Sequence, residues 1–202
     1  MNYWEIVMKV SELIDKNIYA EGLNTGKVLN AIVDMEKLKI THLDVELTKL
    51  ASEEILGVTP SIFRPAKNSL AISALEKGRA CCSDRGLEVK VSKAQLDVYL
   101  TAVGKHETFC LKFGDIIDKK IYAGDYFVGK VKDLYVDEEW KITHLEVELT
   151  KEAAKDLLGG ISAIRNSLAI SALEKWPDCC KNDQLQLCVS KAQLNIYHRP
   201  PK

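Results

Sequence analysis

Paired cysteines are the residues of this 202-residue chain that most invite a chemical interpretation. The chain has two adjacent pairs and two single cysteines: Cys81-Cys82, Cys179-Cys180, Cys110 and Cys188. Four thiolates could hold a tetrahedral zinc ion if the two pairs met. Adjacent cysteines chelate one ion poorly, however, and the usual zinc patterns leave two to four residues between ligands. We therefore predict no metal site and no cofactor, with a cysteine-dependent metal or redox protein kept as an alternative.

Two histidines stand close to acidic residues in the sequence. His42 precedes Asp44, and His144 precedes Glu146, by two positions each. On a strand this spacing gives a shared face but a separation of about 6 to 7 Å. Catalysis by histidine also needs a nucleophile and an orienting acid within reach. We expect surface histidines, with a pH-sensitive contact as the alternative.

Carboxylates alternate with apolar residues in the same segments. Asp44 and Glu46 in one segment, and Glu146 and Glu148 in the other, could be read as acid–base pairs for hydrolysis. A solvated strand face predicts acidic residues at these positions equally well. We predict such a face, and therefore no catalytic residues and no enzyme.

One glycine-rich segment has the spacing of a phosphate-binding loop. Gly124 to Lys130 reads Gly-Asp-Tyr-Phe-Val-Gly-Lys, but Val131 stands where a magnesium-binding Ser or Thr is required. The segment also leads into a β-branched run rather than a helix. We predict a β-turn and no nucleotide binding.

The charge balance is nearly neutral. The chain has 28 Lys and Arg against 29 Asp and Glu, a net charge of −1, and its lysines are spread along the sequence. Direct nucleic-acid binding needs a basic excess that is missing here. Charges interrupt every apolar stretch, and residues 1–12 lack a basic leader, so we expect no membrane insertion and a cytoplasmic protein with reduced thiols.

The sequence repeats itself. Asn68 to Lys77 recurs unchanged as Asn166 to Lys175, and Val91 to Leu96 recurs as Val189 to Leu194. Lys39-Ile-Thr-His-Leu likewise returns from Lys141. We assign residues 1–100 to a first repeat and residues 106–202 to a second, with a linker over about residues 100–105. Each repeat is expected to have its own core.

Each repeat has the pattern of several strands and one short helix. Period-two alternation predicts a strand over residues 43–47 and another over 145–149. The β-branched runs 28–33 and 131–136 are expected to form hairpins, and 87–91 a last strand. Thr48 and Gly57 should cap a helix over 49–56, and Thr150 and Gly159 one over 152–158. These elements predict a small, strongly curved sheet or barrel in each repeat.

The order of these motifs resembles the PRC-barrel family. The relevant motifs are Asp-Lys-x-Ile-Tyr from Asp15 and Asp118, Gly-Lys-Val from Gly26 and Gly129, Ile-Thr-His-Leu-x-Val-Glu-Leu from Ile40 and Ile142, and Ser-Ala-Leu-Glu-Lys before the last strand. The resemblance covers nearly the whole chain twice and is nearest to the archaeal branch. It implies two tandem barrels arranged as an intramolecular pseudo-dimer. Residues 79–85 depart from the family's tight Gly-Asp turn.

The resemblance also implies a role in protein interaction. Family members act as adaptors, and archaeal ones work with the FtsZ/SepF cell-division machinery. We therefore expect a non-enzymatic, protein-binding scaffold, plausible in archaeal cell division. The alternative is a ribosome maturation or RNA-processing factor that, like RimM, docks on a ribosomal protein. The sequence leaves homo-oligomer formation open.

Overall fold

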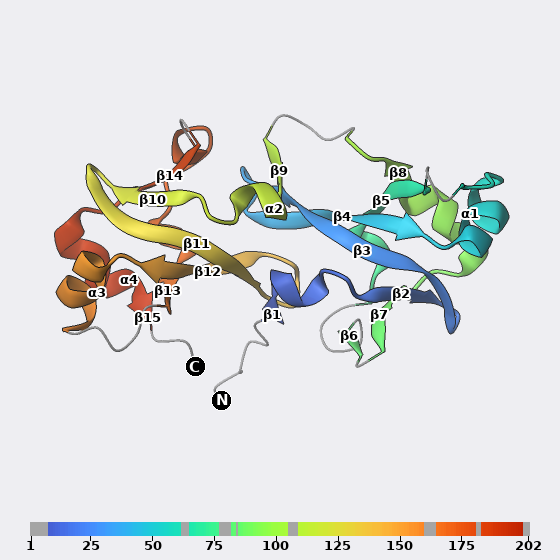
Figure 1. Ribbon diagram of the computed structural model, residues 1–202, viewed down its shortest axis with the longest axis horizontal. Coiled ribbons are helices and arrows are strands. Elements are labelled where there is room, and N and C mark those ends of the chain that lie inside the picture. Colours follow the sequence, from blue (N-terminus) through green and yellow to red (C-terminus); the bar gives the residue numbers. More distant parts are fainter. Residues whose placement is uncertain are drawn as a thin grey trace.

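The computed structural model describes residues 8–61, 65–76, 82–83, 85–104, 109–159, 165–180 and 183–199. Within these residues the chain is mainly β and forms two sheets, which lie side by side along the longest axis (Figure 1). Helix α1 (Lys49–Leu56) and helix α3 (Lys151–Leu158) lie at opposite ends of the molecule. No helix of the described residues is long and apolar enough to span a membrane.

The first sheet has the strand order β6-β7-β2-β3-β4-β5-β8 in the described residues, and β9 also pairs with β3. Strands β2 and β7 are parallel, whereas the other pairs are antiparallel. The strands are β2 (Asn17–Ala20), β3 (Leu23–Asp34), β4 (Lys39–Leu47), β5 (Lys67–Ala71), β6 (Cys82–Ser83), β7 (Gly86–Glu88), β8 (Leu100–Ala102) and β9 (Cys110–Lys112). The 3-10 segments η2 (Ile72–Ala74) and η4 (Lys93–Tyr99) complete this half.

The second sheet has the order β14-β10-β11-β12-β13-β15 in the described residues, and β1 also pairs with β11. Its strands are β1 (Met8–Lys9), β10 (Lys120–Ala123), β11 (Tyr126–Val136), β12 (Ile142–Leu149), β13 (Arg165–Ala169), β14 (Gln184–Leu187) and β15 (His198–Arg199). The short helical segments are η1 (Val10–Leu13), α2 (Phe113–Ile116), η5 (Ile170–Ala172), η6 (Asp178–Cys180), η7 (Lys191–Gln193) and α4 (Leu194–Tyr197).

The local predictions for strands and helices are confirmed. Residues 43–47 lie in β4, where Leu43, Val45 and Leu47 are buried, and residues 145–149 lie in β12. Helix α1 begins after Thr48, whose side chain accepts a hydrogen bond from the Ala51 amide, and ends at Gly57 in the left-handed conformation. Helix α3 repeats this arrangement with Thr150 and Gly159, and begins one residue earlier than expected.

The predicted hairpins are present, but Gly26 and Gly129 lie inside strands and not in the turns. The β2–β3 turn lies at Glu21 and Gly22, so Gly26 is inside β3, beside a register irregularity. A Cβ at Gly26 would lie 2.6 Å from the Glu46 carbonyl oxygen, and one at Gly129 would lie 2.2 Å from that of Glu148. Both glycines therefore allow close approach of two paired strands.

The strand predicted over residues 87–91 is shorter in the structure, and it is not the last of its half, because β8 follows it and β15 follows its counterpart β14. In the first half β7 ends at Glu88, and Val89 forms an isolated bridge with Leu75. In the second half Leu187, at the end of β14, forms the equivalent bridge with Leu173. The strand order of neither sheet forms a closed ring, so the predicted tandem barrels appear as two open sheets in the described residues.

Two strands pair with the sheet of the opposite repeat. Strand β1 belongs to the first repeat in sequence but pairs with β11 of the second sheet. Strand β9 belongs to the second repeat but pairs with β3 of the first sheet. The predicted linker is also partly structured, because β8 occupies its first three residues and pairs with β5.

A single cluster of buried apolar side chains runs through both halves. It includes Val10, Val33 and Ile40 from the first repeat together with Val136 and Trp140 from the second. The expectation of a separate core in each repeat is therefore wrong, because the crossed strands carry buried side chains into the opposite half.

Candidate functional site: the crossed strands and the repeated surfaces

The centre of the molecule is formed by two equivalent crossing units. One is β1 with η1 (residues 8–13), and the other is β9 with α2 (residues 110–116). Val10 and Leu13 of the first unit are buried, as are Phe113 and Ile116 of the second. Each unit thus contributes a strand to the sheet and apolar side chains to the core of the other half.

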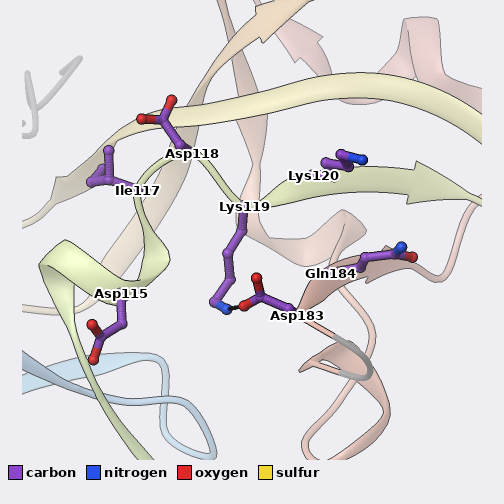
Figure 2. A pocket seen from close by; sticks show the side chains of 7 residues that line it. All are labelled: Asp115, Ile117, Asp118, Lys119, Lys120, Asp183 and Gln184. Atoms are coloured by element: carbon purple, nitrogen blue, oxygen red, sulfur yellow. Dashed lines mark hydrogen bonds and ion pairs between the residues drawn. The ribbon is translucent and has the colours of Figure 1, made fainter.

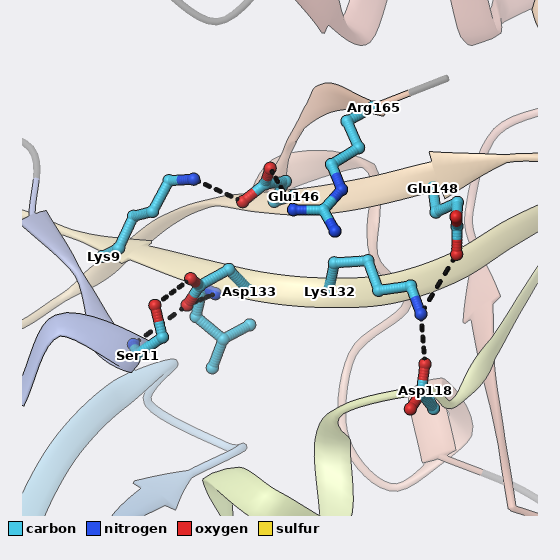
Figure 3. Close-up of polar contacts among 9 residues, drawn as sticks. Lys9, Ser11, Asp118, Lys132, Asp133, Glu146, Glu148 and Arg165 are labelled. Carbon is cyan, nitrogen blue, oxygen red and sulfur yellow. Dashed lines mark hydrogen bonds and ion pairs between the residues drawn. The ribbon is translucent and has the colours of Figure 1, made fainter. Parts of the chain in front are cut away.

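An ion pair accompanies each crossing strand. Lys9 Nζ lies 2.7 Å from Glu146 Oε2 (Figure 3), and Lys112 Nζ lies 3.5 Å from Asp44 Oδ2. Lys9 and Lys112 occupy equivalent positions in the repeats, as do Glu146 and Asp44. The predicted solvated acidic face is wrong for these two carboxylates, because Asp44 is 4% exposed and Glu146 is 7% exposed. The crossing units cover them.

Backbone groups at the crossing are also paired with side chains of the opposite half. Asp133 accepts hydrogen bonds from the Ser11 amide at 3.1 Å and from the Ser11 hydroxyl (Figure 3). At the equivalent place in the other half, Asn30 Oδ1 accepts from the Gly114 amide at 3.2 Å. Helical segments leave their first amides without an internal partner, so these contacts fix the entry to η1 and α2.

The turns before β4 and β12 pair with each other. The Ile40 amide donates to the Trp140 carbonyl at 2.9 Å, and the Ile142 amide donates to the Leu38 carbonyl at 2.8 Å. Leu38 and Trp140 both adopt positive φ, at 51° and 66°. Two equivalent turns therefore exchange equivalent hydrogen bonds between the halves.

Contacts at the crossing shift the pKa values of Lys9 and Tyr135. The hydrogen bond from Lys9 to Glu146 raises the pKa of the Lys9 ammonium, and burial raises the pKa of Tyr135 beside it. Lys9 Nζ also lies 5.4 Å from the centre of the Tyr135 ring. The protonated lysine therefore has both a carboxylate and an aromatic face as partners.

The histidines predicted to face solvent are half-buried. His42 lies opposite Ile32 and Ala71 in the sheet, and its Nδ1 is 3.1 Å from the Thr41 hydroxyl. His144 lies opposite Tyr135 and Ala169. Asp44, two positions on from His42, is buried and accepts a hydrogen bond from the Ser69 hydroxyl.

The other two carboxylates of the alternating segments are half-buried rather than fully solvated. Glu148 lies 3.0 Å from Lys132 Nζ, which also contacts Asp118 at 2.6 Å (Figure 3). Hydrogen bonds to these carboxylates raise the pKa of Lys132, and the bond from Lys132 lowers the pKa of Asp118. Glu46 pairs opposite Lys27 and Lys67 in the sheet. These carboxylates therefore lie beside lysines, as expected of structural ion pairs.

The segment with phosphate-loop spacing is a hairpin, as predicted. Gly124 lies in the turn between β10 and β11 with φ at 60°, and residues 126–130 belong to β11. Because the segment continues as a strand, it does not direct a row of amides toward a phosphate as a helix N-terminus does.

The structure describes one of the two adjacent cysteine pairs completely. Cys179 is buried, Cys180 is half-buried, and their sulfur atoms lie 2.8 Å apart. Cys110 is half-buried and Cys188 exposed. Cys81 and the side chain of Cys82 lie outside the described residues, so the alternative of a four-thiolate zinc site stays untested. Among the described residues, no group of three or more metal-binding side chains is found.

A charged surface depression lies near α2. Figure 2 shows its lining, which consists of Asp115, Ile117, Asp118, Lys119, Lys120, Asp183 and Gln184. Lys119 and Asp183 form an ion pair within it. Small-molecule sites are usually lined by apolar and aromatic side chains, whereas Ile117 is the apolar member of this set. The depression therefore gives little support for a small-molecule substrate.

An exposed aliphatic side chain occurs at the same place in both repeats. Val98 of η4 is 78% exposed, and Ile196 of α4 is 72% exposed. Each follows a capping box, formed by Ser92 with Gln95 or by Ser190 with Gln193. Sequence reasoning missed this pair, although the repeated Ser-Lys-Ala-Gln-Leu motif, which ends two positions before each residue, was a usable signal.

The two ends of the molecule differ beside these aliphatic residues. The first end exposes Leu23 at 50% and Leu50 at 57%, and Tyr126 and Glu152 occupy the equivalent positions at the second end. There Tyr126 donates a hydrogen bond to Asp156 at 3.0 Å, and Lys191 lies over the Tyr126 ring. Burial and the bond to Asp156 raise the pKa of Tyr126 to about 12. The first end is thus the more apolar of the two.

No protein-family model matches the chain, and no curated protein matches it. The resemblance to the PRC-barrel family therefore stays a prediction, carried by the order of the repeated motifs.

Proposed function

We propose that the chain is a non-enzymatic adaptor that presents two equivalent protein-binding surfaces. In this proposal each half is a small barrel of the PRC type, and the halves form an intramolecular pseudo-dimer. The isolated bridges of Leu75 with Val89 and of Leu173 with Leu187 support barrel closure. Next to the second bridge, the Glu174 amide donates to the Gln186 carbonyl at 2.9 Å, which extends the contact along β14.

The observation that carries this proposal is the reciprocal crossing of β1 and β9. It fixes the two halves relative to each other through strand pairing, ion pairs and one shared core. A fixed pair of equivalent surfaces can engage a repeated or polymeric partner at two points. The second contact then forms at a high effective concentration, so that two weak contacts give strong binding.

Val98 and Ile196 are the side chains that we assign to the two binding surfaces. Neither is remarkable alone, because single exposed aliphatic residues are common on protein surfaces. What matters is that the two positions are equivalent in the repeats. Each lies in a short helical stretch that begins with the same capping box. η4 also packs against α1, and the ion pair of Lys93 with Glu54 links the two. The predicted contact residues are therefore presented on ordered elements.

For the biological setting, we propose a scaffold of the archaeal cell-division machinery. This assignment rests on the family resemblance alone. The near-neutral charge of −1 favours a protein partner over a nucleic acid. The ribosome-maturation alternative predicts a different partner, and the same experiment distinguishes them.

The test is affinity capture with the tagged full-length chain from the cells that express it. We compare the unchanged chain with Val98→Asp, with Ile196→Asp and with the double variant. The unchanged chain should retain the partner, and each single substitution should weaken capture because avidity is lost. The double variant also lacks the remaining contact, so its capture should fall at least about tenfold. Leu50→Asp is the control: it changes an aliphatic side chain that is 57% exposed and has no aliphatic counterpart in the second repeat, and it should retain the partner.

The identity of the captured protein decides the setting. Recovery of division proteins supports the cell-division assignment, whereas co-sedimentation with ribosomal particles supports the alternative. Undiminished capture by the folded double variant would exclude Val98 and Ile196 as the contact surface. Thermal unfolding of each variant confirms that the fold is intact.

A further inference from the structure

Cys179 and Cys180 are held unusually close by the fold of the second half. Their sulfur atoms are 2.8 Å apart, within less than 1 Å of the roughly 2.05 Å of a covalent S–S bond. Segment η6 fixes the backbone of both residues, since the Cys179 amide donates to the Lys175 carbonyl at 3.0 Å and the Cys180 amide to Pro177 at 3.3 Å. Two thiols are therefore already aligned against each other.

The two cysteines differ in access. Cys179 has no exposed surface and belongs to the core cluster, whereas Cys180 is half-buried and packs against that cluster. A reagent from solution can therefore reach Cys180 first, and Cys179 is placed to attack the product from within. The geometry therefore assigns Cys180 as the thiol that reacts first and Cys179 as the resolving thiol.

We propose that Cys179 and Cys180 form a reversible oxidation site, in which a small disulfide such as oxidised glutathione converts the two thiols into a bond between adjacent cysteines. This proposal is independent of the adaptor function. It concerns residues of η6, which belong to neither crossing unit and do not include Ile196.

The reaction has two exchange steps that balance. The two thiols share one proton in the monoanion, and when that proton lies on Cys179, Cys180 is the thiolate. This thiolate attacks one sulfur of the small disulfide, so that a mixed disulfide forms and one small thiolate leaves. The Cys179 thiolate then attacks the Cys180 sulfur, and the second small thiolate leaves. In total the protein loses two electrons and two protons, and the small disulfide is reduced to two thiols.

The thiol pair favours loss of its first proton. A hydrogen bond from Cys180 lowers the pKa of Cys179, and the same bond together with burial raises the pKa of Cys180. Such a pair titrates in two steps that belong to both groups, with one proton shared in the monoanion. Lys119 lies close enough to favour a negative charge on Cys180.

The bond would be easily reduced, because adjacent cysteines fit a disulfide poorly. The peptide between them is trans, which holds their Cα atoms about 3.8 Å apart, whereas disulfides usually need about 4.4 to 6.8 Å. Strained disulfides are the labile, regulatory ones. Forming the ring must also distort η6, which packs against β14. Oxidation is therefore expected to loosen this edge of the second sheet.

The full-length chain offers a direct test, because trypsin separates its cysteines. Residues 176–181 carry the adjacent pair, residues 182–191 carry Cys188 alone, and residues 80–85 carry the other pair. After treatment with oxidised glutathione and blocking of free thiols, peptide 176–181 should have lost two hydrogen atoms and carry no adduct. The exposed Cys188 should carry glutathione, and dithiothreitol should reverse both changes.

Two variants separate the roles of the thiols. In Cys179→Ser the glutathione adduct on Cys180 should accumulate at least about tenfold over the unchanged chain, because the intramolecular second step is lost. In Cys180→Ser the buried Cys179 should stay unmodified. Amide exchange over residues 184–187 should become about tenfold faster on oxidation of the unchanged chain.

Three results would overturn the proposal. The first is a stable adduct on peptide 176–181 of the unchanged chain. The second is an unreacted pair under conditions that modify Cys188. The third is a Cys179→Ser variant that does not accumulate the adduct, although thermal unfolding shows that it is folded. Unchanged exchange in β14 of the oxidised chain would overturn the coupling to the sheet.

Discussion

Replacing Gly129 by alanine is expected to lower the free energy of unfolding by at least about 3 kcal/mol, in the range of severe core defects. The added Cβ would lie 2.2 Å from the Glu148 carbonyl oxygen and 3.0 Å from the Leu149 Cα. Both atoms belong to the backbone of β12, which cannot move without breaking its pairing with β11. For a domain of this length the melting temperature should fall by about 6 to 12 °C.

Two other glycines give the matched comparison. Gly26→Ala has the same geometry in the first half with a contact of 2.6 Å, so it should destabilise less than Gly129→Ala. Gly124 has a positive φ but no atom within 4 Å of an added Cβ, so Gly124→Ala should cost only about 1 kcal/mol. Equal melting temperatures for Gly129→Ala and Gly124→Ala would contradict the close approach of the strands.

The second large effect is expected from Asp133→Ala, at about 3 kcal/mol. Asp133 is 4% exposed and accepts from both the amide and the hydroxyl of Ser11 and from the Leu134 amide. Its removal leaves the Ser11 amide and hydroxyl, and the buried Leu134 amide, without this acceptor at the point where η1 crosses to the second half. Thermal unfolding measures the loss, and amide exchange at Ser11 reports whether the crossing unit has opened.

The equivalent residue of the other half is the control. Asn30 accepts from the Gly114 amide at 3.2 Å and the Ala31 amide at 3.0 Å, but it is neutral and half-buried. Asn30→Ala should therefore cost about 1 kcal/mol. A larger loss for Asn30→Ala than for Asp133→Ala would show that Asp133 does not hold the crossing together.

The parts of the fold that depend on local sequence could be predicted. Thr48 and Gly57 bound α1 because an N-cap oxygen and a left-handed glycine act within one helical turn. The alternation of Leu43, Val45 and Leu47 fixes which face of β4 is buried, because side chains of a strand alternate between its faces. The duplication then allowed each local inference to be checked against a second copy.

The errors arise where contacts connect distant segments. Alternation placed Asp44 and Glu146 on a wet face, and nothing near them in sequence indicates that a strand from the other repeat covers them. One signal for this contact was present elsewhere in the sequence. Lys9 and Lys112 are equivalent in the repeats, and each precedes an apolar pair, Val10 with Leu13 or Phe113 with Ile116.

The candidate interaction surface escaped prediction for a different reason. Exposure of Val98 and Ile196 depends on how η4 and α4 pack, which periodicity over so few residues does not determine. The closeness of the Cys179 and Cys180 sulfurs likewise depends on side-chain conformation. For adjacent cysteines, sequence alone suggested divergent directions.

The central claim is that each half takes a strand from the other within one chain, and zero-length cross-linking tests it most directly. A carbodiimide joins a lysine to a carboxylate only where the two form an ion pair. In the monomer we predict bonds from Lys9 to Glu146 and from Lys112 to Asp44, whose atoms lie 2.7 Å and 3.5 Å apart. The local pair of Lys37 with Asp34, at 3.1 Å, is the positive control. A monomer that contains the Lys37–Asp34 bond but neither cross-half bond would contradict the crossed arrangement.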